Sequence, residues 1–143
     1  MGYQNLKKKI KLNEGFSLKA YKDQLGYLTI GYGHLILSDE KILLKKNIHK
    51  KELEEIFEKD FEKALSDFNK TLKPITSNKK EADLIIEMIF QLGIKGCLKF
   101  KNLIKNMRKG NKHLVCLDMM DSLWYKQTPN RVRNLIKIFL NNE

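Results

Sequence analysis

The clearest pattern of hydrophobic and polar positions in this chain predicts one long helix near its middle. Apolar residues recur there with a period of about 3.6 residues, as on the buried face of an amphipathic helix. They are Leu53, Ile56, Phe57, Phe61, Ala64, Leu65, Phe68 and Leu72. Glutamates crowd the first half of this segment, which suits the positive end of a helix dipole. We therefore expect a helix from about Lys50 to Thr71, stopped by Pro74.

The segment before this helix has the pattern of a short helix followed by short strands. Leu6 and Ile10, spaced among lysines, predict an amphipathic helix that ends near residues 13–15. Between Leu18 and Leu35, tyrosines and β-branched residues alternate with glycines. This composition is typical of short strands joined by tight turns, so we expect a small antiparallel sheet. A short helix over residues 39–46 should follow it.

After Pro74 the pattern is helical to the end of the chain. We expect helices over about 78–92, 97–107, 112–121 and 129–140. Asn78 with Glu81 resembles a capping box at the first of these starts. Thr128 followed by Pro129 predicts the last start, with the hydroxyl as cap and proline at the first helical position.

Together these elements predict an α+β fold, mainly helical, in a single domain of residues 1–143. We expect a small mixed lobe at 14–49, a connecting helix at 50–72 and a helical lobe at 75–143, with residues 1–13 packed on the helical lobe. A cleft between the lobes would be the natural ligand site.

The charge balance favours an acidic partner. The chain has 28 basic and 17 acidic residues, a formal net charge of +11. Nucleic acid, anionic lipid and acidic polymers of a bacterial envelope all fit such a surplus, and so does a merely solvated lysine-rich surface. The three arginines are Arg108, Arg131 and Arg133. Since bidentate readout of bases favours arginine, we do not expect nucleic acid to be the partner.

Several other expectations follow from residue types and runs. Cys97 and Cys116 each lie in an apolar helical stretch, so we expect buried free thiols. The first residues lack the apolar run of a secretory signal, and no segment reaches the roughly 18 apolar residues of a membrane span. We therefore expect synthesis in the cytoplasm of a host, no stable membrane insertion and a monomer. The His and Cys spacing predicts no metal site, and we expect no cofactor.

The candidate chemistry lies near the N-terminus. Glu14 is followed by Asp23 and Thr29. Two carboxylates in different surroundings are the minimum for acid–base cleavage of a glycosidic bond, and a nearby hydroxyl can hold the attacking water. Phe16 and Leu18 provide an apolar setting that would raise the pKa of Glu14 and let it carry a proton. Taken singly, the three residues also fit a helix end, a turn and a strand.

The string from Glu14 to Leu35 resembles the catalytic segment of the T-even phage endolysins, the phage-type lysozymes. The Gly-x-Gly-His-Leu sequence of that family is present at residues 31–35. The resemblance implies that Glu14 is the proton donor and that Asp23 and Thr29 position the attacking water. The family inverts at the anomeric carbon, which implies a carboxylate separation of about 6.5–9.5 Å.

Two further blocks extend the resemblance in the same order along the chain. Residues 88–93 read Met-Ile-Phe-Gln-Leu-Gly, and residues 124–131 read Trp-Tyr-Lys-Gln-Thr-Pro-Asn-Arg. The family's substrate contacts carry over to Leu35, Phe90, Gln91, Asp118 and Arg131. The resemblance also implies that Arg131 reaches Glu14 and that His34 pairs with Asp60. An arginine beside Glu14 would lower its pKa unless desolvation offset it or bound sugar displaced it.

The resemblance therefore implies a bacteriolytic, antimicrobial glycoside hydrolase of phage or prophage origin. It would cut the β-1,4 bond between N-acetylmuramic acid and N-acetylglucosamine in peptidoglycan, degrading the cell wall once the membrane is breached in host lysis. Three alternatives remain open. They are a lytic transglycosylase on the same fold, which would need Glu14 without a water-activating aspartate, a non-enzymatic cationic binder of the envelope, and a nucleic-acid binder.

Overall fold

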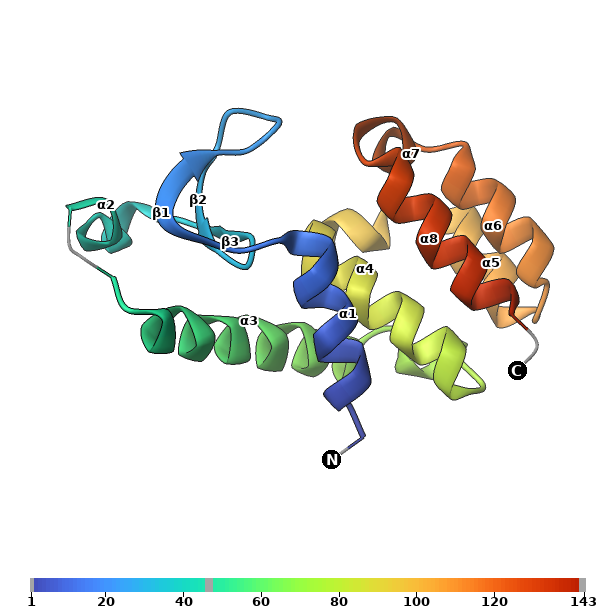
Figure 1. Ribbon diagram of the computed structural model, residues 1–143. Coiled ribbons are helices and arrows are strands. Elements are labelled where there is room, and N and C mark those ends of the chain that lie inside the picture. The colour runs from blue at the N-terminus through green and yellow to red at the C-terminus, as the bar shows by residue number, and fades with distance from the viewer. Residues whose placement is uncertain (1, 46–47, 142–143) are drawn as a thin grey trace. The chain divides into compact units, whose positions relative to one another are not determined.

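The computed structural model describes residues 2–45 and 48–141 and has the expected α+β, mainly helical architecture (Figure 1). The chain divides into two compact units, Met1–Lys63 and Ala64–Glu143. The division falls inside α3 (Lys50–Lys70), the long helix that the hydrophobic stripe predicts. The finer partition into lobes at 14–49, 50–72 and 75–143, and the packing of residues 1–13 on the helical lobe, remain predictions.

The first unit combines a three-stranded antiparallel sheet with helices. The sheet has the order β1-β2-β3 and consists of β1 (Ser17–Lys22), β2 (Leu28–Gly31) and β3 (His34–Leu35). The helix α1 (Gln4–Glu14) precedes it, and it ends where the sequence predicts. The helix expected over 39–46 consists of a 3-10 turn, η1 (Ser38–Glu40), and α2 (Ile42–Lys45). Position 46 lies outside the described residues.

Ion pairs and apolar contacts hold α1 and the sheet to α3. Lys7 Nζ lies 2.7 Å from Glu58 Oε1, and Lys11 Nζ lies 2.8 Å from Glu54 Oε2. The Tyr32 hydroxyl donates a hydrogen bond to the other oxygen of Glu54, and this bond, with burial, raises the pKa of Tyr32 to about 12. Ile10 of α1, Ile30 of β2, and Leu53, Phe57 and Phe61 of α3 are buried in this unit.

The second unit is helical. After η2 (Lys73–Ile75) it contains α4 (Lys79–Leu98), α5 (Lys101–Arg108), α6 (Lys112–Met120), α7 (Leu123–Gln127) and α8 (Pro129–Leu140). In this unit α5 packs against α6, and α8 contacts α4, α6 and α7 (Figure 1). Its buried apolar side chains include Leu84, Ile85, Ile86, Met88, Ile89, Leu103, Met107, Val115, Met119, Trp124, Val132, Leu135 and Phe139.

Helix boundaries in the second unit differ from the prediction in three places. Gly93 does break α4, with φ 77°, but helical structure resumes and continues to Leu98. The expected start of the helix over 97–107 is therefore wrong, because Cys97 and Leu98 belong to α4 and α5 begins only at Lys101. The rest of that helix is confirmed, since α5 continues to Arg108. The helix α7 was not predicted, and the Ser122 hydroxyl caps it by accepting from the Tyr125 amide at 3.2 Å.

The expected cap of the last helix is half right. Pro129 occupies the first turn of α8, as predicted, but the Thr128 side chain makes no capping hydrogen bond to the described residues of that helix. Its hydroxyl instead donates to the Trp124 carbonyl oxygen at 3.2 Å, because α7 ends directly before it. At the start of α4, Asn78 accepts from the Glu81 amide at 2.9 Å, as the capping-box pattern predicts.

The two cysteines are buried free thiols, as predicted. Burial raises the pKa of the Cys97 thiol to about 12 and also raises that of Cys116, although the charge of Lys112 opposes the second shift. Across the described ranges, no helix is both long and apolar enough to cross a membrane.

Candidate active site

Glu14 is the last residue of α1, and its carboxylate lies directly against the backbone of Gly33. The helix ends because Gly15 adopts φ 74°, and the Gly15 amide still donates to the Lys11 carbonyl at 3.0 Å. A Cβ added at Gly33 would overlap the Glu14 carboxylate, with 2.8 Å to its Cδ. Gly33 has φ 76°, which glycine adopts without strain. The turn before β3 therefore forms one wall of the Glu14 site.

Thr29 lies at the centre of a row that crosses the sheet. The antiparallel register pairs Tyr21 of β1 with Thr29, and Thr29 with Leu35 of β3. Directly opposed residues of an antiparallel sheet project from the same face. Thr29 is 4% exposed, and its hydroxyl donates to the Tyr27 carbonyl at 3.0 Å, which leaves its oxygen lone pairs as acceptors. Leu35 is exposed at the end of this row.

Asp23 opens the turn that joins β1 to β2. Its Oδ1 accepts hydrogen bonds from the amides of Leu25 and Tyr27, both at 2.9 Å. Gly26 completes the turn with φ 85° and donates its amide to the Asp23 carbonyl at 3.0 Å. Among the residues that the structure describes, none donates to Asp23 Oδ2. One carboxylate oxygen is thus fixed by the backbone, and the other remains available to a water or ligand.

The pKa of Tyr21 is affected by both candidate carboxylates. Its pKa is raised by burial and by the negative charges of both Glu14 and Asp23. Charge interactions weaken with distance and screening, and both carboxylates act on the same phenol. Tyr21 is also the cross-strand partner of Thr29.

His34 is held between two carboxylates. Its Nδ1 lies 2.8 Å from Asp60 Oδ2 on α3, the pair that the resemblance implies, and its Nε2 lies 2.9 Å from Glu40 Oε1 on η1. The bond to Asp60 raises the pKa of His34 to about 9, with a further contribution from Glu40 that burial partly opposes. Burial also disfavours ionisation of Glu40, but the Leu37 amide and His34 outweigh it and lower the Glu40 pKa.

The contacts of His34 with Asp60 and Glu40, which we call the His34 clamp, predict that the stability of the fold depends on pH. The pKa of His34 is about 9 in the folded protein, above the ordinary value of 6.5. The contribution of His34 to the free energy of unfolding is therefore full below about pH 6.5 and is lost as pH rises through 9. We expect His34→Gln to lower the free energy of unfolding by about 2–3 kcal/mol at pH 6 and by much less at pH 10. Urea unfolding at both values measures this. His113→Gln, at an exposed position, is the control, and a pH-independent His34→Gln effect would contradict the clamp.

In the second unit, Arg131 of α8 is paired with a glutamate that the sequence analysis missed. Glu87 of α4 is 1% exposed and Arg131 is 9% exposed. Glu87 Oε2 accepts from Arg131 Nε at 3.2 Å and from Nη2 at 3.1 Å. Glu87 is the single acidic residue in the apolar run 84–90. This position could have predicted a buried carboxylate that needs a basic partner. The predicted approach of Arg131 to Glu14 remains a prediction.

Gln91 is fixed by the third sequence block. Trp124 Nε1 donates to Gln91 Oε1 at 2.8 Å, and Gln91 Nε2 donates to the Thr128 hydroxyl at 3.2 Å. Both ends of the amide are therefore engaged, and its orientation is set by α7 and the start of α8. Phe90, its neighbour on α4, is half-buried.

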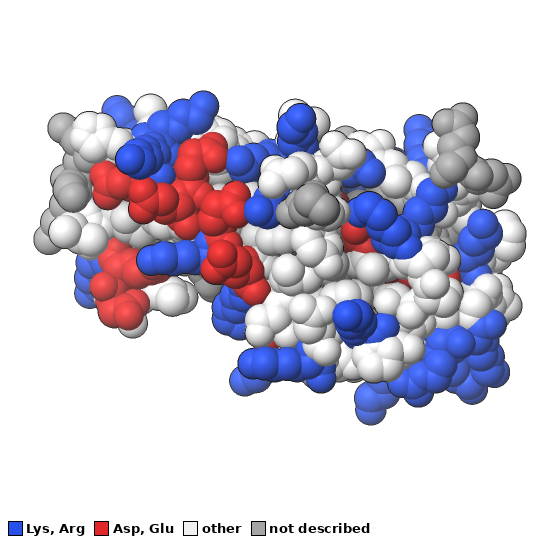
Figure 2. Space-filling model, turned by 90° about the horizontal axis from the view of Figure 1, so that it is seen from below, with Lys and Arg blue, Asp and Glu red and all other residues white. Residues whose placement is uncertain are grey.

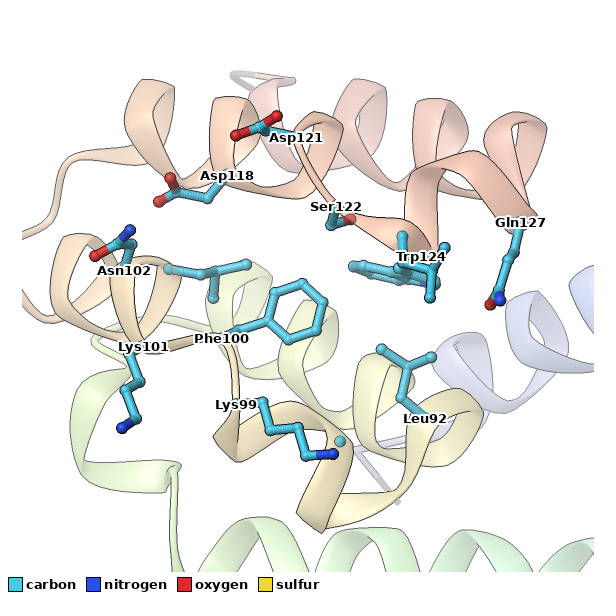
Figure 3. Close-up of a pocket in the computed structure, with 13 residues that line it drawn as sticks. Leu92, Lys99, Phe100, Lys101, Asn102, Asp118, Asp121, Ser122, Trp124 and Gln127 are labelled. Carbon is cyan, nitrogen blue, oxygen red and sulfur yellow. The ribbon is translucent and has the colours of Figure 1, made fainter.

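Asp118 lines a cavity of about 450 Å³ inside the second unit. Its Oδ2 accepts from Asn106 Nδ2 at 2.8 Å. Figure 3 shows Asp118 and Asp121 along one side of this cavity and Lys99 and Lys101 along the other, with Phe100 and Trp124 between them. Phe100 and Trp124 meet there edge to face, with ring centroids 6.1 Å apart. A cavity with apolar floor and charged walls fits a polar ligand that has apolar parts.

Within residues 2–45 and 48–141, no group of three or more His, Cys, Asp or Glu side chains is arranged to hold a metal ion. The candidate residues of the first unit are two carboxylates, at the end of α1 and in the β1–β2 turn, and a buried threonine hydroxyl on β2. Such a set fits the acid–base chemistry of a glycoside hydrolase.

Comparison with known proteins agrees with this class. Residues 11–137 match the family model described as Phage lysozyme, so the chain belongs to the phage lysozyme family. It is 35% identical to Probable T4-type lysozyme 1 and 33% identical to Probable T4-type lysozyme 2, both of Dictyostelium discoideum. Each match covers 94% of this chain, with 92% and 93% of those proteins.

A third relative is the Pre-baseplate central spike protein Gp5 of Enterobacteria phage T4, at 30% identity over 92% of this chain and 27% of that protein. The resemblance inferred from the three sequence blocks is therefore confirmed. The protein is a lysozyme, a hydrolase that cleaves peptidoglycan.

Proposed function

We propose that this lysozyme hydrolyses the β-1,4 bond between N-acetylmuramic acid and N-acetylglucosamine with inversion at the anomeric carbon. Glu14 is the general acid that protonates the leaving oxygen, and Asp23 and Thr29 position the attacking water. The observation that carries this proposal is geometric: two amides fix Asp23 at the turn before Thr29, and the Glu14 carboxylate lies against Gly33 at the turn after it.

The surroundings of the two carboxylates support different roles for them. Asp23 accepts two amide hydrogen bonds on Oδ1, which fix the orientation of its carboxylate. Its Oδ2 can accept a proton from water, and the Thr29 hydroxyl oxygen can accept a hydrogen bond from the same water. Glu14 is half-buried at the C-terminus of α1, with its carboxylate against the Gly33 backbone. A proton donor opposite an ionised carboxylate with a water is the inverting arrangement.

Substrate contacts are proposed at both units. Leu35 is exposed on the face of the sheet that carries Thr29, where it can contact sugar. In the second unit we propose contacts from Phe90, Gln91, Asp118 and Arg131. Gln91 and Arg131 support this role because internal partners already fix their orientation, which lowers the entropy cost of binding.

Analysis of the product ends tests the reaction. Hydrolysis of purified peptidoglycan is expected to release muramic acid with a free reducing end, which borohydride converts to the alcohol. A lytic transglycosylase would instead leave 1,6-anhydro ends that borohydride does not reduce, and that product would overturn the proposal. Asp23 and Thr29 beside Glu14 favour hydrolysis, since the intramolecular reaction needs no positioned water.

Gly33→Ala is expected to lower the rate of wall clearing by about 100-fold, because the new methyl group displaces the Glu14 carboxylate. Gly26→Ala is a matched control: Gly26 also has a positive φ, 85°, but no described atom lies within 4 Å of its added Cβ. Both variants should lose about 1–2 kcal/mol of stability from backbone strain. Turbidity clearing and urea unfolding measure the two effects. Equal activity losses in the two variants would show that strain alone is responsible.

A further inference from the structure

Residues 99–112 carry six cations and no acidic residue. They are Lys99, Lys101, Lys105, Arg108, Lys109 and Lys112, and all six side chains are exposed. None forms an ion pair with another residue in the described part of the chain. The second unit as a whole holds 15 of the Lys and Arg residues but 7 of the Asp and Glu residues. Figure 2 shows blue side chains gathered over it, whereas red ones gather over the first unit.

The helix α5 arranges part of this charge in a line. Lys101, Lys105 and Arg108 are spaced four and three residues apart, so they share one helix face, and Lys109 adjoins them. A rise of about 1.5 Å per residue separates Lys101 from Lys105 by about 6 Å along the axis, and Lys105 from Arg108 by about 4.5 Å. Leu103 and Met107, each 2% exposed, occupy the opposite face. We call Lys101, Lys105, Arg108 and Lys109 the cationic stripe.

The stripe differs from two lysines of α1 in the first unit, which are paired with carboxylates. Lys7 and Lys11 of α1 are paired with Glu58 and Glu54. Like charges one helical turn apart destabilise a helix by a few tenths of a kcal/mol per pair. An unpaired stripe therefore carries a cost that an anionic partner would remove, and its regular spacing suits a partner with regularly repeated charges.

We propose that the cationic stripe binds a phosphodiester-linked polyanion of the bacterial envelope and retains the enzyme at the wall. The apolar face of α5 is buried against the core of the second unit, so this helix has no apolar surface to insert into a lipid bilayer. Three of its four cations are lysines, whose compact charges suit phosphate groups without base readout. That this binding retains the enzyme at the wall rests on the proposed function, whereas the binding to a phosphodiester polyanion does not.

Two triple variants with equal charge loss test this proposal. Lys105→Gln, Arg108→Gln and Lys109→Gln remove three stripe cations that do not line the cavity. Lys8→Gln, Lys70→Gln and Lys137→Gln remove three exposed cations elsewhere, two of them also in last helical turns. Co-sedimentation of the full chain is measured on purified walls that bear a phosphodiester polymer and on the same walls stripped with hydrofluoric acid, over a salt series.

We expect the stripe variant to bind intact walls about tenfold more weakly than the wild type, and the control variant less than about threefold more weakly. The slope of log affinity against log salt should fall by about 2 for the stripe variant, since fewer phosphates are neutralised. On stripped walls the three proteins should bind alike and release reducing ends at the same rate.

Equal losses in both variants, or unchanged wild-type binding after stripping, would overturn the proposal. Tighter binding to duplex DNA than to intact walls would assign the stripe to nucleic acid instead and would also overturn it. Failure of the proposed function gives a different result. The reducing ends would then be absent, or 1,6-anhydro ends would replace them, while wall binding would still depend on the phosphodiester polymer.

Discussion

Glu14→Gln is expected to lower the rate of peptidoglycan cleavage by about 10²–10⁴-fold, the usual contribution of a general acid. The amide has nearly the same shape as the carboxyl group but carries no transferable acidic proton. Since the side chain lies at the end of α1 and against Gly33, the isosteric change should leave packing intact. The free energy of unfolding should therefore change little, which separates catalysis from folding. Turbidity clearing of purified walls measures the rate.

Glu62→Gln is the matched control, since Glu62 is an exposed residue of α3 with the same chemical change. It should clear walls at the wild-type rate. If Glu14→Gln also clears at that rate, the protein acts on the envelope by charge and not by acid catalysis. Retained binding of Glu14→Gln to walls, without release of reducing ends, is the expected companion result.

Glu87→Gln is expected to lower the free energy of unfolding by about 3 kcal/mol or more. The substitution removes the negative charge of Glu87 from its buried pair with Arg131, and breaking a buried pair from one side costs about 3–5 kcal/mol. Asp83→Asn is the comparison, because Asp83 pairs with the exposed Lys79 at 2.9 Å. That change should cost less than about 1 kcal/mol. Urea unfolding at pH 7 measures both.

Replacing both partners separates structure from function. Glu87→Leu combined with Arg131→Met should recover most of the lost stability, since an apolar pair of similar volume can replace a buried ion pair at little cost. If Arg131 contacts substrate as proposed, this double variant should still bind walls more weakly and raise KM. Full stability together with wild-type KM would restrict Arg131 to a structural role. Equal destabilisation by Glu87→Gln and Asp83→Asn would contradict the buried-pair argument.

Patterns carried by neighbouring residues were predictable from the sequence. The row of apolar residues from Leu53 to Leu72 predicts the C-terminal end of α3 to within one residue, because helix periodicity is a local property. Turn residues predict the small sheet for the same reason. The break between α4 and α5 was not predictable in this way, since it coincides with the contact of Phe100 with Trp124, a residue distant in sequence.

Glu14, Asp23 and Thr29 as candidates, the small sheet, the long helix and the family could all be inferred from the chain's residues in order. Local periodicity, turn chemistry and the resemblance were sufficient for these. Three contacts became known only from the folded chain: Gly33 as a wall of the Glu14 site, Glu40 as a second partner of His34, and Glu87 as the partner of Arg131. Each of these contacts joins separate elements of the fold, so burial and packing, and not local sequence, select the partner.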